Sequence, residues 1–215
     1  MPEGPRFRTL GAPQSGRAAL LIDLHCHTFP LSQCSSLKPE ECIDLARARG
    51  LDGVCLTEHD SFWDDGATAE LAARTQFLIF TAIELSTDIG HVLAFGLKAG
   101  GGALATGAAA FAAAQRDGGL LYLAHPARDG LLRVDHHTVE YFESVEAANG
   151  SDSRLQNIAA AGLAHGFRLP GIGGSDGHTP AEVGRAATRF EANVRDNAGL
   201  LAALRSGAYE AVTLT

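Results

Sequence analysis

The sequence is poor in lysine, in cysteine and in long apolar stretches, and each scarcity argues against a class of protein. No run is long and apolar enough for a transmembrane helix, and residues 1–18 lack the apolar segment of a signal peptide. The four cysteines all lie within the first 55 residues and form no C-x-x-C pair. A chain of 215 residues can bury a core without disulfide bonds, so we expect reduced thiols in a cytoplasmic protein.

Basic side chains are fewer than acidic ones, 17 against 25, which gives a net charge of −8. This balance disfavours an extended nucleic-acid surface, because such surfaces neutralise many phosphates with lysine and arginine. A small anionic substrate stays compatible if its site supplies positive charge locally. We expect residues 1–18, which are basic and rich in Pro and Gly, to form a flexible arm, and residues 19–215 to form one domain without internal repeats.

Short apolar runs alternate with helical patterns through the rest of the chain. Strands are predicted at residues 19–24, 53–56, 78–83, 91–97, 120–124, 144–148, 170–173, 187–191 and 209–214. Helices are predicted at residues 39–49, 103–115, 154–165 and 196–205, the first of them between Pro39 and Gly50. The alternation predicts an α/β fold of parallel β-α units, most simply a barrel.

Histidines and carboxylates follow nearly every predicted strand, where the chemistry of such folds is found. They are His25, His27, Glu58, His59, Asp60, Glu84, His91, His125, Asp176 and His178. Neither lysine of the chain lies among them. A ring of imidazoles and carboxylates needs positive counter-charge, and divalent Zn, Mn or Fe suits these ligands. The ligands are too many for one ion, so we expect two or three ions.

These stretches resemble the PHP (polymerase and histidinol phosphatase) family of metal-dependent phosphoesterases. The resemblance runs from residue 23 to residue 178 and rests on Asp23-Leu-His-Cys-His-Thr28, Leu56-Thr-Glu-His-Asp60, Ile83-Glu84, Gly90-His-Val-Leu93, Ala124-His-Pro126 and Gly174-Ser-Asp-Gly-His178. Each motif is weak alone, but their shared order is specific. The resemblance implies a distorted seven-stranded, TIM-like (β/α) barrel with a metal site at the carboxyl ends of its strands.

The resemblance also implies a ligand set. One ion would be held by His25, His27, Glu84 and Asp176; a second by Glu84, His91 and His125; a third by His59 and His178. The third site departs from the family, which usually places an Asp or His shortly after the second histidine, whereas residues 31–35 read LSQCS. Three possibilities stay open for the missing ligand of the third site: a thiolate from Cys34, a carbonyl oxygen from Gln33, or a weakened site completed by water.

The implied reaction is hydrolysis of a small phosphate ester, either a phosphomonoester or a nucleotide or oligonucleotide end, by a metal-bridged hydroxide. His59, His178 or a metal-bound water would protonate the leaving oxygen. Asp60 would either orient a ligand or cap the next helix, and Asp23 would orient a histidine.

Three further residues are candidates for substrate binding. Arg128 would clamp a phosphate, unless it is an ordinary surface arginine. Trp63 would pack on a base or sugar, or simply anchor its loop. Asn149 would touch the substrate, or cap the helix after Ser151.

Other functions stay open. The chain can be a non-catalytic PHP module that binds metal in a structural or regulatory role. Amidohydrolases and TatD-type nucleases also begin with H-x-H, but the bridging lysine typical of amidohydrolases has no counterpart between Lys38 and Lys98 or after Lys98. TatD-type enzymes lack the Ser-Asp-x-His of residues 175–178. We expect a small phosphorylated substrate and no membrane contact; the oligomeric state is left open.

Overall fold

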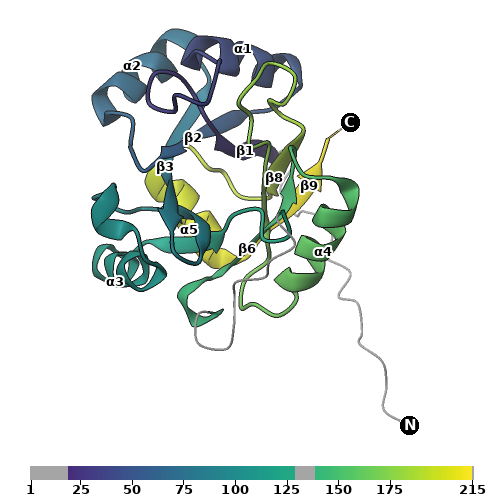
Figure 1. The fold of residues 1–215 in the computed structure, drawn as a ribbon. Coiled ribbons are helices and arrows are strands. Elements are labelled where there is room, and N and C mark those ends of the chain that lie inside the picture. The colour runs from purple at the N-terminus through teal and green to yellow at the C-terminus, as the bar shows by residue number, and fades with distance from the viewer. Residues whose placement is uncertain (1–18, 129–138, 215) are drawn as a thin grey trace.

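The computed structural model describes residues 19–128 and 139–214, which form a nine-stranded sheet with helices packed around it (Figure 1). The sheet has the order β7-β6-β5-β4-β3-β2-β1-β8-β9 and curls into a nearly closed barrel. The predicted α/β barrel class is therefore confirmed, with nine strands in place of seven. The predicted N-terminal arm, residues 1–18, lies outside the described residues.

The elements follow the predicted order. The strands are β1 Leu20–Cys26, β2 Gly53–His59, β3 Leu78–Thr87, β4 Gly90–Phe95, β5 Leu120–Leu123, β6 Ser144–Asn149, β7 Ile172–Gly174, β8 Ala186–Phe190 and β9 Tyr209–Thr213. The α-helices are α1 Pro39–Ala48, α2 Asp65–Thr75, α3 Gly107–Asp117, α4 Arg154–Ala164 and α5 Asn197–Ser206. Two short 3₁₀ helices, η1 Gly102–Leu104 and η2 Val139–Tyr141, complete them.

The sheet is mixed, which corrects the prediction of uniformly parallel β-α units. Strand β4 is antiparallel to both β3 and β5, and β8 is antiparallel to both β1 and β9. Only two residues separate β3 from β4, which is too short for a parallel crossover, so the chain reverses there. As a result β4 begins, rather than ends, at the edge where the parallel strands finish, and its second residue is His91.

Capping side chains set the helix bounds. The helix predicted at 103–115 is α3, which starts later because the Thr106 side chain accepts a hydrogen bond from the Ala109 N–H. No helix is predicted where α2 lies, yet Asp64 caps it by accepting from the Ala67 N–H. None of the helices in the described ranges is both long and apolar enough to cross a membrane.

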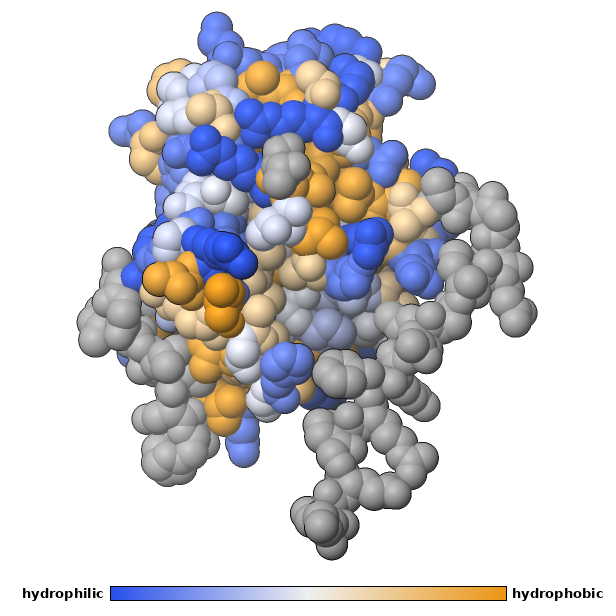
Figure 2. Space-filling model, turned by 90° about the vertical axis from the view of Figure 1, so that its right-hand side faces the viewer, coloured by the Kyte–Doolittle hydropathy of each residue, from blue (hydrophilic) through white to orange (hydrophobic). Residues whose placement is uncertain are grey.

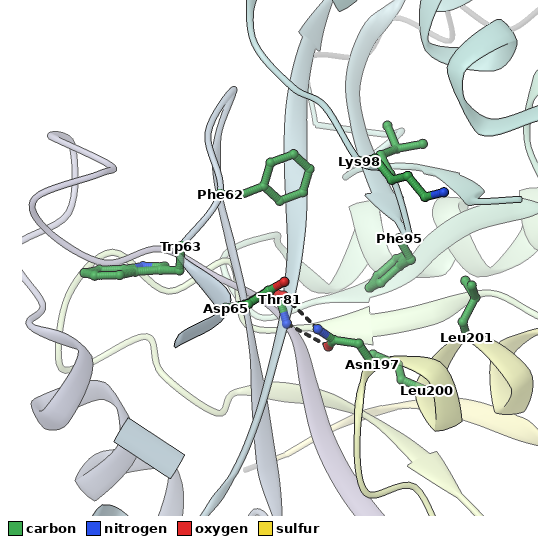
Figure 3. A pocket seen from close by; sticks show the side chains of 11 residues that line it. Phe62, Trp63, Asp65, Thr81, Phe95, Lys98, Asn197, Leu200 and Leu201 are labelled. Carbon is green, nitrogen blue, oxygen red and sulfur yellow. Dashed lines mark hydrogen bonds between the residues drawn. The ribbon is translucent and has the colours of Figure 1, made fainter. Parts of the chain in front are cut away.

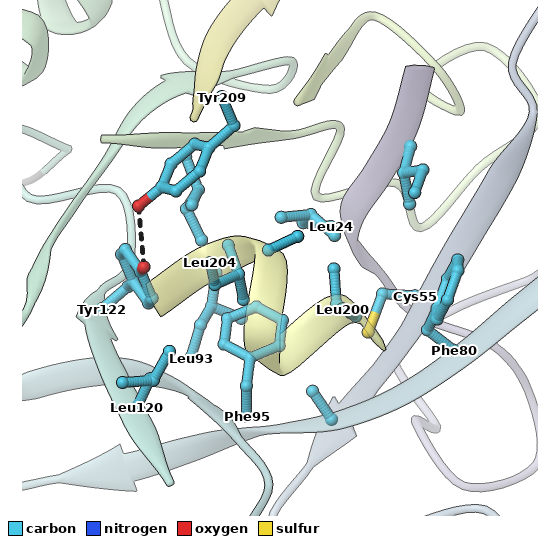
Figure 4. Close-up of a cluster of buried hydrophobic side chains, with 14 of the residues drawn as sticks. Leu24, Cys55, Phe80, Leu93, Phe95, Leu120, Tyr122, Leu200, Leu204 and Tyr209 are labelled. Carbon is cyan, nitrogen blue, oxygen red and sulfur yellow. Dashed lines mark hydrogen bonds between the residues drawn. The ribbon is translucent and has the colours of Figure 1, made fainter. Parts of the chain in front are cut away.

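The interior of the barrel is filled by inward-facing side chains of the strands, with α5 packed among them (Figure 4). Leu200 and Leu204 of α5 contact this core, and both are almost fully buried. The hydroxyl groups of Tyr122 and Tyr209 hydrogen bond to each other at 2.8 Å inside it. The pairing satisfies two polar groups that would otherwise be costly to bury.

The barrel closes where β7 meets β1 and β8. Thr188 of β8 bridges to β7, since its hydroxyl accepts from the Gly173 N–H and donates to the Gly173 carbonyl. Gly174 lies so close to β1 that a Cβ placed on it would be 2.4 Å from the Cβ of His25. Glycine at this position therefore sets how closely the two strands can approach.

Because of this close contact, Gly174→Ala should lower the free energy of unfolding by roughly 1–3 kcal/mol, the usual cost of overpacking. Gly102→Ala is the matched control, since nothing lies within 4 Å of its Cβ position. Urea denaturation followed by circular dichroism would measure both. Equal stability of the two variants would show that the absence of a side chain at Gly174 does not set the distance between β7 and β1.

Candidate metal centre

A β-bulge turns the first two histidines toward the interior. Ile22 and Leu24 of β1 already face the core, so regular alternation would turn Cys26 inward next. The register with β2 instead shifts between Asp23 and Cys26. Both His25 and His27 are consequently buried at the mouth of the barrel, while Cys26 packs outward with its Sγ 3.1 Å from that of Cys42.

Glu84 lies at the centre of the histidine cluster and is fully buried. It is located inside β3, three residues before the end of the strand, rather than after it as predicted. Five imidazole nitrogens lie within 3.0–3.4 Å of its two carboxylate oxygens: those of His25, His27 and His59 on Oε2, and those of His91 and His125 on Oε1.

Asp176 faces Glu84 across the first two histidines. Its Oδ1 is 3.4 Å from His25 Nε2 and 3.3 Å from His27 Nε2. The two Nε2 atoms are themselves only 3.0 Å apart. Four side chains, from β1, from β3 and from the loops after β1 and β7, therefore direct donor atoms at one point.

The described residues contain three groups whose donor atoms all lie within 4.8 Å of one another. These groups are His25-His27-Glu84-Asp176, His59-Glu84-His91 and His27-His59-His178. The residues fit divalent cations, because Glu84 Oε2 is buried without a hydrogen bond although imidazole nitrogens surround it. Imidazole and carboxylate donors suit Zn, Mn or Fe. Metal identity and number stay predictions.

The electrostatics of the cluster also call for positive charge. Burial raises the pKa of Glu84, but the neighbouring imidazoles, led by His25, bring it well below its usual value. Burial lowers the pKa of His25, yet the carboxylates of Glu146 and Asp176 bring it well above its usual value. The raised pKa of His25 favours its protonated form beside these carboxylates, whereas burial lowers the pKa values of His59 and His178. A divalent cation would take over the role of counter-charge and release protons.

Glu146, which the sequence motifs do not mark, holds the ring of His25. Its Oε1 accepts from His25 Nδ1 at 2.9 Å, which leaves Nε2 of neutral His25 with the lone pair directed at the cluster. Its Oε2 accepts from the His125 backbone N–H. The signal that the sequence offered was a glutamate inside a predicted strand. The structure shows that this position is fully buried.

Asp23 acts on the backbone rather than on an imidazole, which corrects its predicted role. Its Oδ1 accepts from the backbone N–H groups of His25 and Ser175, and so ties β1 to the loop after β7. On that loop, His178 Nδ1 donates to the Asp176 carbonyl at 2.9 Å. Since a carbonyl only accepts, His178 Nε2 is left free to bind a cation.

Three residues of the site adopt left-handed backbone conformations, which are uncommon for residues other than glycine. Asp60, His125 and Asp176 have φ values of 51°, 29° and 53°. Each follows directly or closely after a strand, where the chain turns sharply. Such strain persists only when the surrounding contacts fix the conformation, and it is frequent at functional sites.

The LSQCS loop contributes a residue that the sequence did not mark. Ser32 is buried, and its Oγ lies 3.3 Å from His27 Nδ1 and accepts from the His59 N–H. Gln33 and Cys34, the two candidates for the third site, are both exposed. Cys34 belongs to none of the three donor groups found within the described ranges.

Arg128 lies beside the cluster. Its guanidinium donates to Asp176 Oδ2 at 2.5 Å, to Asp152 Oδ1 at 2.7 Å and to Asn149 Oδ1 at 3.0 Å. Burial lowers the pKa of Arg128, but the carboxylate of Asp176 brings it above its usual value. The cation is therefore held firmly, with 31% of the side chain exposed.

Asn149 is 1% exposed, and its amide is fully occupied inside the protein. Its Nδ2 donates to Glu146, and its Oδ1 accepts from the N–H groups of Ser151 and Asp152. It shapes the turn before α4, whereas the N-cap of α4 is Ser153. Substrate contact by Asn149 stays a prediction.

Asp60 and Trp63 make contacts away from the cluster centre. Asp60 Oδ1 accepts from the Ser86 N–H, while Asp64 supplies the helix cap. Trp63 Nε1 donates to the buried carboxylate of Glu58 at 2.7 Å, so the indole anchors its loop. Trp63 also borders a cavity of about 400 Å³ between Phe62, Lys98 and α5, which none of the predicted ligands lines (Figure 3).

Comparison with known proteins finds one matching family model and several solved structures of similar fold. The model of the PHP-associated family, PHP_C, matches residues 154–209. A two-domain protein from Bacteroides vulgatus, described as containing a predicted PHP-like metal-dependent phosphoesterase, has a solved structure that aligns with a TM-score of 0.74 at 22% identity. That alignment covers 99% of this chain and 70% of the other. The chain thus resembles the PHP-associated family over residues 154–209 and shares the overall fold of a PHP-like protein.

Two further solved structures are similar to this fold. PsfC from Pseudomonas syringae aligns with a TM-score of 0.68 at 20% identity, over 93% of each chain. An amidohydrolase from Chromobacterium violaceum, solved with bound sulfate and no metal, aligns with a TM-score of 0.58 at 21% identity, over 76% of this chain and 89% of the other. Identities this low establish the fold alone. The comparison with curated proteins finds no match.

Glu146→Gln should weaken metal binding by about 10–100-fold, because the amide loses the charge that orients His25 and raises its basicity. Glu143→Gln is the control, since Glu143 pairs with Arg168 and touches none of the predicted ligands. Isothermal titration of the chelator-treated proteins with Zn²⁺ or Mn²⁺ would compare them. Equal affinities would exclude a role of Glu146 in holding the metal site.

Cys34 should be the one thiol of the native protein that is alkylated quickly, since Cys26, Cys42 and Cys55 are buried. Burial and nearby carboxylates raise the pKa of Cys34, so it should react more slowly than a free thiol. We expect metal to leave that rate unchanged, as measured by iodoacetamide labelling and mass spectrometry. Protection by metal would instead identify Cys34 as a ligand.

Proposed function

We propose that this chain is a metal-dependent hydrolase that cleaves a small phosphate ester. The observation that carries the proposal is the buried convergence of imidazoles on Glu84 and Asp176 at one end of a PHP-type barrel. The description of the Bacteroides vulgatus neighbour as a PHP-like metal-dependent phosphoesterase supports the choice of reaction. The residues proposed to hold the ions are His25, His27, His59, Glu84, His91, His125, Asp176 and His178.

Divalent ions bound there would supply a Lewis acid and lower the pKa of water toward neutrality. The residues of the chain then divide into two layers. His25, His27 and Glu84 are at most 1% exposed, and so can hold an ion but cannot reach a substrate. His59 and His178 are 28% and 25% exposed, and we propose that they border the bound ester and carry protons to the leaving oxygen.

Arg128 is the proposed anchor for the phosphate. Asp152 and Asn149 hold its guanidinium beside Asp176, so less side-chain entropy is lost when an anion binds than for a free arginine. Since Asp152 and Asp176 compensate the charge of this guanidinium, most of the local positive charge for a phosphate would come from the bound ions. Asp60 is tied to Ser86 and would act by holding the turn that directly follows His59.

Two alternative functions predict different results in an assay of phosphate release and metal content. A non-catalytic PHP module would bind metal without turnover. The amidohydrolase named among the neighbours raises amide hydrolysis. The only lysines of the chain, Lys38 and Lys98, however, line two cavities that contain none of the predicted metal ligands.

The metal-loaded protein should release phosphate from p-nitrophenyl phosphate, from nucleoside monophosphates or from a 5′-phosphorylated oligonucleotide, and should leave a p-nitroanilide amide intact. His25→Ala and Asp176→Asn should lose both metal, measured by inductively coupled plasma mass spectrometry, and activity. His165→Ala is the control, because His165 is exposed at the end of α4, outside the cluster. Bound metal without turnover of any ester would support the non-catalytic module instead.

Arg128→Lys should raise KM for the ester by about tenfold or more, because a lysine cannot keep the forked contacts with Asp152 and Asp176. Metal content should change little, as the first donor group stays complete. Steady-state kinetics with metal analysis of the same sample would separate the two effects. A normal KM would remove Arg128 from the substrate site.

A further inference from the structure

Helix α4 presents an apolar stripe to solvent on the side of the barrel away from α1 and α2 (Figure 1). Leu155 and Ile158 are 78% and 57% exposed, and they are two of only three large hydrophobic side chains exposed in the described ranges. Ala159 and Gly162, also exposed, continue the stripe at helical spacing. On this face of the molecule, hydrophobic side chains gather in the middle (Figure 2).

The stripe is complementary to itself in shape. Its first half carries two large side chains, and its second half carries an alanine and a glycine. A two-fold axis between residues 158 and 159 would place Leu155 against the partner's Gly162, and Ile158 against the partner's Ala159. Large side chains would thus meet small ones at both ends of an isologous contact, where the same patch serves both copies.

The charges of α4 favour the same arrangement. Arg154, in the first turn, is the only charged residue of the helix, although the whole chain carries a net charge of −8. In an antiparallel pair, each Arg154 would approach the carboxyl end of the other helix, which bears partial negative charge. Two acidic molecules can therefore meet here without the repulsion expected elsewhere on their surfaces.

The contact can extend beyond the helix. Eleven residues span only about 16 Å, so two helices alone would bury little area. Beside α4, however, lies a groove of about 580 Å³, lined by Ile158, Arg185 and, from β9 and the residue after it, Ala211 and Leu214. The groove therefore widens the surface that α4 offers to a partner beyond the helix itself.

We propose that α4 and this groove are the contact surface between two copies of the chain, packed with their α4 helices antiparallel. The full-length protein should sediment as a dimer that dissociates on dilution, as followed by analytical ultracentrifugation. Since the readout is the oligomeric state, the outcome does not depend on the proposed hydrolase activity. A monomer at every concentration tested would overturn the proposal.

Two variants and a control locate the contact. Gly162→Leu should weaken the dimer by about tenfold or more, because its side chain would occupy the place of the partner's Leu155. The monomer can accept it, since nothing lies within 4 Å of a Cβ at Gly162. Ile158→Glu should weaken the dimer similarly by burying a charge.

Ala73→Glu, at an exposed position of α2, is the control and should leave the dimer unchanged. Circular dichroism would establish that each variant is folded. A dimer that tolerates both Gly162→Leu and Ile158→Glu must form through another surface, and this result would refute the proposed contact.

Discussion

The burial of several carboxylates at one end of the barrel is the constraint on which the rest of this structure depends. Glu84, Asp176 and Glu146 are almost completely removed from water, and ionised groups there are costly unless charges and hydrogen bonds compensate them. The histidines supply that compensation, and the pKa of Glu84 lies well below its usual value for this reason. The same arrangement would present several donor atoms to a divalent cation.

The backbone is shaped to bring these groups together. A bulge in β1 changes which side chains face inward, the reversal at β4 brings His91 to the mouth, and Gly174 lets β7 approach His25 closely. Hydrogen bonds from Asp23 and Thr188 then fasten the strands at the closure. The left-handed conformation of Asp176 is tolerated because its backbone N–H donates to the His25 carbonyl at 2.7 Å.

One of the cavities lined by described residues lies apart from the candidate metal centre. The cavity beside Phe62 and Lys98 is lined by none of the predicted ligands, whereas Arg128 and the partly exposed His59 and His178 surround the buried donors. A likeness of fold shared with proteins described as a phosphoesterase and as an amidohydrolase does not choose between their reactions. The donor set and the fixed guanidinium are the physical grounds for favouring a phosphate ester.

The sequence by itself determined the order of strands and the histidine and carboxylate motifs that follow them, because buried strands are apolar and their polar ends stand out. It did not mark Glu146 or Ser32, since single polar residues in a strand or loop carry no periodic signal. Nor could it reveal α2, because this helix buries only Thr68 and Leu71 and its amphipathic pattern is therefore weak. Only the tertiary structure decided that β4 runs antiparallel, that Asp23 holds backbone N–H groups, and that Glu84 lies between five imidazoles. Those facts depend on contacts between residues far apart in the chain, which no local pattern encodes.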